Sequence, residues 1–184
     1  KKLGKHVEVM ITDGSQPIGN GIGPSLEARD VMWILKRDSR RPLDLEKKCI
    51  AMCANIFKMA GIKDGAKKAI ELLDSGKAYR KMEEIIKAQG GKEINPEKIA
   101  VGKYAYSIVS KKSGTVKGIS NAYITRIARI AGAPQNKGAG IYIYKHVNDR
   151  VKKGDKLYTI HAESEQRLKF AKEVAENSLV YVLK

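Results

Sequence analysis

Helical spacing of apolar residues dominates the first half of the chain. An alternating run at His6–Ile11 is typical of a strand, and four stretches with apolar residues at i, i+3 and i+4 follow it. These stretches begin near Ser25, Asp44, Asp64 and Ala78. Because short glycine turns join the last three, we expect a compact helical layer.

The first of these helices has a predicted buried face and a clear end. Ser25 is a good N-cap residue, and Pro42 pushes its predecessor out of the helical conformation. The residues that we expect to face the core are Ala28, Val31, Met32 and Leu35.

Beyond residue 98 the pattern changes from helical to mixed. The polar stretch Glu93–Lys98 contains Pro96, so we place a boundary there, with one domain at residues 1–98 and another at 99–184. Two short helices, capped by Asn121 and Ser164, lie among several strands, which predicts an α+β fold. The expected strands are Tyr104–Ser110, Gly114–Ile119, Ile141–Val147, Leu157–Ala162 and Leu179–Leu183.

The two cysteines, Cys49 and Cys53, fall on the apolar face of the second helix. A C-x-x-x-C spacing without further ligands is poor for zinc, and a disulfide within one helical turn has poor geometry. We therefore expect buried, unreactive thiols and no metal site. Free thiols suit a reducing cytoplasm, which is the predicted location.

Positive charge is concentrated in the second half of the chain. The formal net charge is +16, and residues 99–184 hold 16 Lys and Arg against 6 Asp and Glu. Such an excess attracts anionic partners, either phosphorylated small molecules or nucleic acid, although it also simply favours solubility. No run approaches the ~20 apolar residues of a membrane-spanning helix, and no signal-peptide pattern opens the chain. We expect no membrane partner.

A segment rich in glycine, Ile11–Glu27, is the most informative part of the sequence. It holds four glycines and two prolines between the predicted strand and the first helix, which is where α/β proteins place ligands. Its spacing, Gly19-x-Gly21-x-Gly23, matches neither the dinucleotide loop nor the phosphate-binding loop of nucleotide hydrolases. By spacing alone, a ligand loop and a plain structural turn both remain open.

The amino-acid sequence of this segment resembles that of the corresponding segment in the pyrimidine nucleoside phosphorylases. Thr-Asp-Gly-Ser-Gln-Pro-Ile-Gly at Thr12–Gly19 and Gly-Ile-Gly-Pro-Ser-Leu-Glu-Ala at Gly21–Ala28 carry the resemblance, in a form similar to the archaeal AMP phosphorylases once labelled thymidine phosphorylases. Further matches follow in family order along the chain. They are Leu72–Ala78, Met82, Ala88–Gly91, Ser113–Val116, Ala131–Pro134, Lys137–Ile141 and Val151–Asp155.

The resemblance implies a pentosyltransferase that splits the N-glycosidic bond with inorganic phosphate and needs no cofactor. The substrate would be AMP or a related nucleotide, giving free base and ribose 1,5-bisphosphate, with thymidine phosphorylase as the alternative. The family's phosphate-binding Lys-x-Ser loop and its base-binding Arg…Ser…Lys set precede the Thr-Asp-Gly-Ser-Gln-Pro segment, and neither is found before that segment in this sequence. We therefore expect no catalytic residue in this chain, and no turnover by the chain alone.

The same resemblance implies an arrangement in three parts. Residues 1–44 would complete the large α/β domain that carries phosphate, the helical layer would follow, and residues 99–184 would form a C-terminal domain of the α/β-hammerhead type. The candidate site residues lie on the glycine segment, where we expect them to support the phosphate site without touching substrate. They are Asp13, Ser15, Gln16, Gly19, Gly21 and Gly23.

Because Lys1 opens the chain where methionine is usual, we expect a piece of a longer protein. The resemblance implies that the intact enzyme is a homo-oligomer that dimerises mainly through an N-terminal helical domain. The piece would then be a monomer or an artificial dimer. Since an unpaired strand edge invites association, we expect artificial packing at Val7–Ile11.

A second resemblance concerns Val151–Ala162, which is similar to the biotinyl and lipoyl carriers. Aligning Ile160 with the carrier isoleucine places Ser164 where the modified lysine would stand. Without that lysine there is no swinging-arm chemistry. The pattern then indicates only a similar small β fold, which agrees with the domain expected for residues 99–184.

An alternative from another class is a basic nucleic-acid-binding module. The charge of residues 99–184 supports it, together with tyrosines that could stack on bases, namely Tyr104, Tyr106, Tyr142 and Tyr144. No RRM, KH or helix-turn-helix pattern supports it. Strict alternation of the tyrosines is more typical of one covered face of a sheet, so we regard nucleic acid as the less favoured partner.

The three histidines, His6, His146 and His161, lie in no recognisable catalytic motif. No G-x-S-x-G, H-E-x-x-H or C-x-x-C pattern occurs either. The sequence by itself therefore assigns no general base and no nucleophile.

Overall fold

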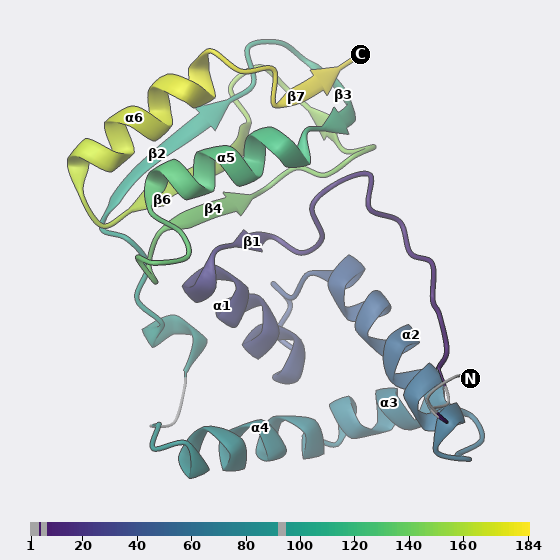
Figure 1. Cartoon of the computed structure of the whole chain (residues 1–184). Coiled ribbons are helices and arrows are strands. Elements are labelled where there is room, and N and C mark those ends of the chain that lie inside the picture. Colours follow the sequence, from purple (N-terminus) through teal and green to yellow (C-terminus); the bar gives the residue numbers. More distant parts are fainter. Residues whose placement is uncertain (1–3, 5–6, 92–94) are drawn as a thin grey trace.

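A helical layer and a mixed C-terminal domain lie at opposite ends of the molecule, with one helix between them (Figure 1). The computed structural model describes residue 4, residues 7–91 and residues 95–184. The layer consists of α2 (Leu43–Met59), α3 (Gly65–Asp74) and α4 (Lys77–Ala88), and the helix between the two ends is α1 (Pro24–Leu35). The expected α+β class is confirmed.

Two small antiparallel sheets build the C-terminal domain. The first has the strand order β1-β4-β6-β2, with β1 (Gly21–Ile22), β4 (Gly140–Ile143), β6 (Lys156–Ala162) and β2 (Tyr104–Val109). The second has the order β5-β3-β7, with β5 (Arg150–Val151), β3 (Gly114–Ile119) and β7 (Tyr181–Leu183). Helices α5 (Asn121–Ala131) and α6 (Glu165–Glu176) pack on each other and on β6. The short 3-10 helix η1 (Pro96–Lys98) lies between α4 and β2.

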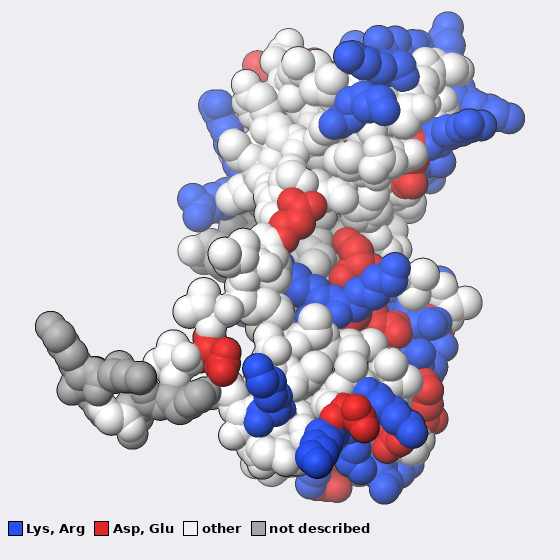
Figure 2. Space-filling model, turned by 90° about the vertical axis from the view of Figure 1, so that its right-hand side faces the viewer, with Lys and Arg blue, Asp and Glu red and all other residues white. Residues whose placement is uncertain are grey.

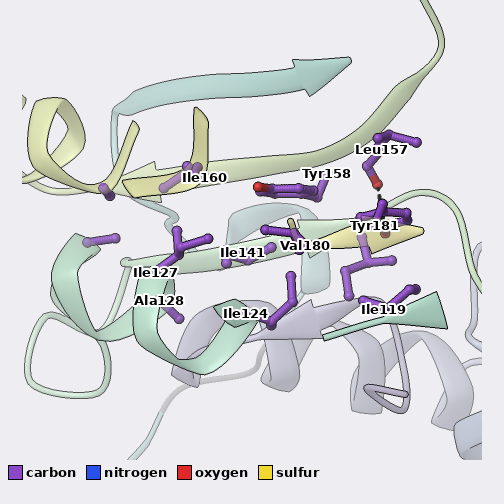
Figure 3. Packing of buried hydrophobic residues seen from close by; sticks show 14 of the residues in the cluster. Ile119, Ile124, Ile127, Ala128, Ile141, Leu157, Tyr158, Ile160, Val180 and Tyr181 are labelled. Atoms are coloured by element: carbon purple, nitrogen blue, oxygen red, sulfur yellow. Dashed lines mark hydrogen bonds between the residues drawn. The ribbon is translucent and has the colours of Figure 1, made fainter. Parts of the chain in front are cut away.

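The main hydrophobic core lies inside this C-terminal domain (Figure 3). Ile127, Ile141 and Ile160 are each 0% exposed, and they come from α5, β4 and β6. Each fully buried side chain of this size contributes about 1.5–3 kcal/mol relative to an exposed one. Tyr158 stacks on Tyr181 with ring centroids 5.9 Å apart, which joins the two sheets.

The strand predicted at His6–Ile11 is wrong for the residues that the structure describes. His6 lies outside the described residues, and residues 7–14 form neither strand nor helix. Val7, Val9 and Ile11 are 72%, 82% and 95% exposed. An alternating apolar run becomes a strand only when it pairs with another one, and no described strand pairs with it.

The buried face of α1 also differs from the prediction. Val31 is 37% exposed, while Trp33 and Asp30 are 2% and 1% exposed. The helix begins one residue before Ser25, with Gly23 at the N-cap and Pro24 in the first turn. The buried face includes Asp30 because its carboxylate accepts hydrogen bonds from the glycine segment. A pattern of apolar residues alone does not predict this.

The apolar stripe of α2 is exposed, so the prediction of buried thiols is wrong. Cys49 and Cys53 are both exposed and free, and Met52 and Ile56 are 47% and 61% exposed. Helix α2 packs chiefly against α3. The amphipathic pattern correctly predicts a helix, but nothing among the described residues covers the face of α2 that carries Cys49, Met52, Cys53 and Ile56.

Smaller differences concern the ends of elements. The predicted strand Ile141–Val147 ends at Ile143. Helix α5 is capped by Ser120, whose hydroxyl accepts from the N–H of Tyr123, whereas Ser164 caps α6 as expected. No described helix is long and apolar enough to cross a membrane.

The domain boundary at residues 98 and 99 stays a prediction. Strand β1, from before that boundary, pairs with β4 in the C-terminal sheet, with Gly21 opposite Tyr142 and Ile22 opposite Ile141. The part of the glycine segment that forms β1 therefore belongs to the C-terminal sheet.

Candidate functional site

The glycine segment lies between the helical layer and the C-terminal domain. Its chain passes beside α2, reaches the C-terminal domain and turns back into β1 and α1 (Figure 1). Backbones approach so closely there that a Cβ added to Gly23 would overlap the carbonyl oxygen of Ala139, and one added to Gly140 would overlap that of Ile22. Gly23 also has φ +117°, which L side chains rarely adopt. Both glycines are required by close packing against the sheet.

Carboxylates from the chain itself occupy the N–H groups of this segment. The Asp30 carboxylate accepts from the N–H groups of Asn20 and Gly21, at 2.7 and 2.8 Å. Asp44 accepts from the N–H of Gly19 at 3.0 Å, and Glu27 accepts from that of Gly23 at 2.9 Å. An anion-binding loop needs free N–H groups. Because these four are already paired with anions, the geometry favours a structural loop.

Asp30 is the most buried of these carboxylates, at 1% exposure. Burial raises the pKa of Asp30, and the N–H groups of Gly21 and Asn20 act in the opposite direction. One carboxylate oxygen, Oδ1, has no hydrogen-bond partner among the described residues. The residue therefore fixes the turn at a cost in desolvation.

Two side chains of the segment hold the loop that follows β4. Gln16 Oε1 accepts from the N–H of Val147 at 2.8 Å. Asn20 Oδ1 lies 2.9 Å from Nε2 of His146, and the backbone oxygen of Asn20 accepts from the N–H of Ile143 at 2.7 Å. Gln16 thus lies at the contact between the glycine segment and the C-terminal domain.

Asp13 and Ser15 lie on the exposed side of the segment. The N–H of Ser15 donates to Asp13 Oδ1 at 2.8 Å, and this hydrogen bond lowers the pKa of the Asp13 carboxyl. The structure thus separates the six predicted site residues. Asp13 and Ser15 form an exposed turn, whereas Gln16, Gly19, Gly21 and Gly23 make the contacts described above. Their support of a phosphate site stays a prediction.

The carboxylates Asp30, Asp44 and Glu27 were missed as partners of the glycine segment. A sign was present in the sequence, because Asp30 stands among the apolar residues of the first helix. A buried acid within a dozen residues of a turn rich in glycine is a natural acceptor for the N–H groups of that turn.

An ion cluster joins the end of α1 to the helical layer. Glu46, on α2, accepts from Arg37 Nη1 and Arg41 Nε, each at 2.6 Å. Arg37 also contacts Asp74 of α3 at 2.9 Å. Burial alone would raise the pKa of Glu46, but the hydrogen bonds from both arginines outweigh it and hold the pKa below its usual value. The cluster fixes α1 on the layer and leaves none of these groups free for catalysis.

The described histidines do not form a catalytic arrangement. Apart from its contact with Asn20, His146 has a buried Nδ1 without a partner among the described residues. Nδ1 of His161 lies 3.4 Å from the carbonyl oxygen of Gly102, and burial lowers the pKa of His161. No group of three or more His, Cys, Asp or Glu within the described part of the chain could hold a metal ion.

The tyrosines proposed for base stacking are partly committed to other contacts. Tyr142 is half-buried, packing edge-on against Trp33 and Tyr144 with centroids 6.5 and 5.0 Å apart. The hydroxyl of Tyr106 donates to Glu176 at 2.7 Å. The four residues therefore do not form one open stacking surface, which counts against the nucleic-acid alternative.

Comparison with known proteins identifies the C-terminal domain. Residues 115–182 match the model for the pyrimidine nucleoside phosphorylase C-terminal domain. These residues belong to the pyrimidine nucleoside phosphorylase family. Ser164 caps α6, and no lysine stands at the position of the modified lysine of the carriers, so the likeness of Val151–Ala162 to lipoyl-type carriers indicates no swinging-arm chemistry.

Similarity to phosphorylases extends far beyond this domain. The chain is 49% identical over 175 residues, 93% of its length, to an AMP phosphorylase of Pyrococcus horikoshii, and 46% identical over 180 residues to one of Methanocaldococcus jannaschii. It is also 42% identical over 182 residues to a putative thymidine phosphorylase of Albidiferax ferrireducens. The chain spans only 34–35% of the length of these relatives. The similarity therefore concerns about a third of each of these longer proteins.

Proposed function

We propose that the whole protein of which this chain is a part catalyses phosphorolysis of AMP. An oxygen of inorganic phosphate bonds to the anomeric carbon of the ribose while the C–N bond to adenine breaks. The base leaves with the bonding electron pair and takes up a proton. The products are adenine and ribose 1,5-bisphosphate, and inorganic phosphate is the only co-substrate.

The sequence identity of 48–49% to AMP phosphorylases over more than nine-tenths of the chain carries this proposal. Thymidine phosphorolysis is the second candidate, since a relative with that printed name is 42% identical. The family's phosphate-binding and base-binding motifs are not found before the glycine segment in this sequence, so we assign substrate selection to the rest of the protein.

Within the proposed enzyme, this chain has a supporting role. The glycine segment would connect the catalytic domain to the C-terminal domain through Gln16 and β1. Carboxylates occupy the loop N–H groups where phosphate would otherwise bind, which supports the expectation that no catalytic residue lies here. We further propose a cytoplasmic enzyme that works as a homo-oligomer.

Base release with and without phosphate tests the proposal. The full-length protein and this chain are each incubated with AMP, CMP, UMP and thymidine, and free base is separated by chromatography. We expect release of adenine by the full-length protein only, dependent on phosphate. Release from thymidine but not from AMP would transfer the proposal to the second candidate, and release by this chain alone would contradict the supporting role.

A further inference from the structure

Two open strand edges line one groove of the C-terminal domain. Strand β2 ends the four-stranded sheet, and β7 ends the three-stranded sheet. Both edges belong to the wall of a groove of about 640 Å³, in the segments 106–112 and 178–183. The rest of the lining comes from Leu157 and Tyr158 of β6 and from Ala175 and Glu176 of α6.

The backbone of both edges is available for pairing. Among the described residues, β2 pairs only with β6, and β7 pairs only with β3. The N–H and C=O groups on the outer side of each strand therefore have no strand partner in the described part of the chain. An unpaired edge is a template for a further strand, and this groove is bordered by two such edges.

Apolar side chains at the groove are unusually exposed. Leu179 is 71% exposed, Val109 46% and Val182 44%. A strand that entered the groove would cover them with the side chains of every second residue. The groove therefore offers both parts of strand recognition, which are main-chain hydrogen bonds and shallow apolar sites.

Positive charge at one end of the groove favours an added strand that carries acidic residues. Lys111 and Lys112 follow Ser110 just beyond the end of β2 and are exposed, and no described carboxylate lies within ion-pair distance of either. Lys153 and Lys184 lie nearby, because the N–H of Lys153 donates to Ser113 and Lys184 pairs with Thr115. Figure 2 shows basic side chains gathered over the C-terminal domain, at the top of the view, whereas acidic and basic side chains mix over the helical layer at the bottom.

We propose that this groove binds an extended, acidic segment of a partner protein, which adds as a strand between β2 and β7. The segment carries apolar side chains at alternate positions. Every strand pair of the domain is antiparallel, so the added strand runs antiparallel to β2. Its acidic residues then stand at its N-terminal end, beside Lys111 and Lys112. This interaction is independent of the proposed phosphorolysis.

Fluorescence anisotropy with a designed peptide tests the proposal on this chain. The peptide has two aspartates followed by six alternating Val and Thr residues, and the control peptide has proline in place of one central Val, which removes an N–H donor. We expect saturable binding of the first peptide, weakened at least tenfold in the second. The rate of amide hydrogen exchange should fall at Tyr106–Val109 and Tyr181–Leu183 when the first peptide is bound.

Charge reversal supplies a matched control. We expect Lys111→Glu with Lys112→Glu to weaken binding at least tenfold, because the aspartates would meet like charge. Lys67→Glu with Lys68→Glu, an exposed pair on α3, should leave the affinity unchanged. All four positions are exposed, so each variant is expected to keep the fold, which circular dichroism checks.

Three results would overturn the proposal. One is the absence of binding up to about 1 mM peptide, which corresponds to less than about 4 kcal/mol of binding free energy. Another is equal affinity for the proline peptide or for the Lys111→Glu/Lys112→Glu chain. The third is self-association of the chain, measured by sedimentation, that the peptide displaces, since the groove would then belong to a second copy.

Discussion

The carboxylate of Asp30 accepts a hydrogen bond of 2.8 Å from the backbone N–H of Gly21, nine residues earlier in the chain. This contact holds the first helix against the strand that joins the C-terminal sheet. A glycine-rich turn before a helix commonly binds a phosphate. Here an internal anion takes that position, so the turn fastens two parts of the protein together.

Removing the Asp30 carboxylate should destabilise the chain. In Asp30→Ala, the N–H groups of Asn20 and Gly21 lose their acceptor in a buried place, at about 1–3 kcal/mol for each unsatisfied group. We expect the free energy of unfolding to fall by about 2–4 kcal/mol in urea titrations, and by less in Asp30→Asn, which keeps an acceptor oxygen. Asp64→Asn, at an exposed left-handed position, is the matched control and should change little. An Asp30→Ala chain as stable as the control would contradict the role given to this carboxylate.

Asp30 and Glu46 should make opposite contributions to the pH dependence of stability. Burial raises the pKa of Asp30 above its ordinary 3.8, so its contribution is greatest below that pH and declines as pH rises through the native pKa. The pKa of Glu46 is held below its ordinary 4.5, so its contribution is present above pH 4.5 and is lost as pH falls. Urea unfolding between pH 3 and 7 of Asp30→Asn and Glu46→Gln measures the two differences from the unmodified chain. The same sign of slope for both would contradict the assignments.

The close approach at Gly23 should not tolerate a methyl group. Gly23→Ala meets the Ala139 carbonyl and keeps a positive φ. Overpacking costs about 1–3 kcal/mol and the left-handed backbone about 1–2 kcal/mol, so we expect a loss of about 2–4 kcal/mol in unfolding free energy. Gly14→Ala has open space around the new Cβ and no positive φ, and should be nearly neutral. Equal stability of the two variants would show that β1 does not dock on β4 as described.

The apolar face of α2 should be covered in the full-length protein. Cys49 and Cys53 are exposed in this chain, so Cys53 should react with a thiol reagent at a rate close to that of a free peptide, and Cys49 more slowly because burial raises the pKa of its thiol. In the full-length protein we expect labelling at least ten times slower, because an exposed apolar stripe of this kind is normally an interface. Mass spectrometry identifies the labelled residue. Equal rates in both proteins would mean that this face of α2 stays uncovered.

Local patterns predicted most of the helices, because apolar spacing and capping residues such as Ser164 act within a few residues. The failures all depend on distant partners. The run at Val7–Ile11 has a strand pattern but no described strand beside it. The stripe around Cys49 has a helical pattern but no described surface against it. The two-residue strand β1 forms only because β4 lies beside it, and no local pattern marks it.

Prediction of the candidate site was likewise limited by contacts with residues distant in the sequence. The resemblance to a known family located the glycine segment and singled out Gln16, which contacts the loop after β4; its support of a phosphate site stays a prediction. Two of the carboxylates that accept from the segment's N–H groups, Asp30 and Asp44, come from later positions in the chain through tertiary contacts, whereas Glu27 makes a local contact. Spacing alone does not show which acid will turn inward, and the buried face predicted for α1 left Asp30 out.

The product of the reaction tests the central claim most directly. The full-length protein is incubated with AMP and phosphate, and the sugar product is identified by phosphorus NMR, with this chain alone as the parallel sample. We predict ribose 1,5-bisphosphate, with phosphorus signals for both the C1 and C5 esters and one equivalent of adenine, from the full-length protein, and no product from the chain alone. Adenine release by the chain alone, or no bisphosphate from the full-length protein, would contradict the account.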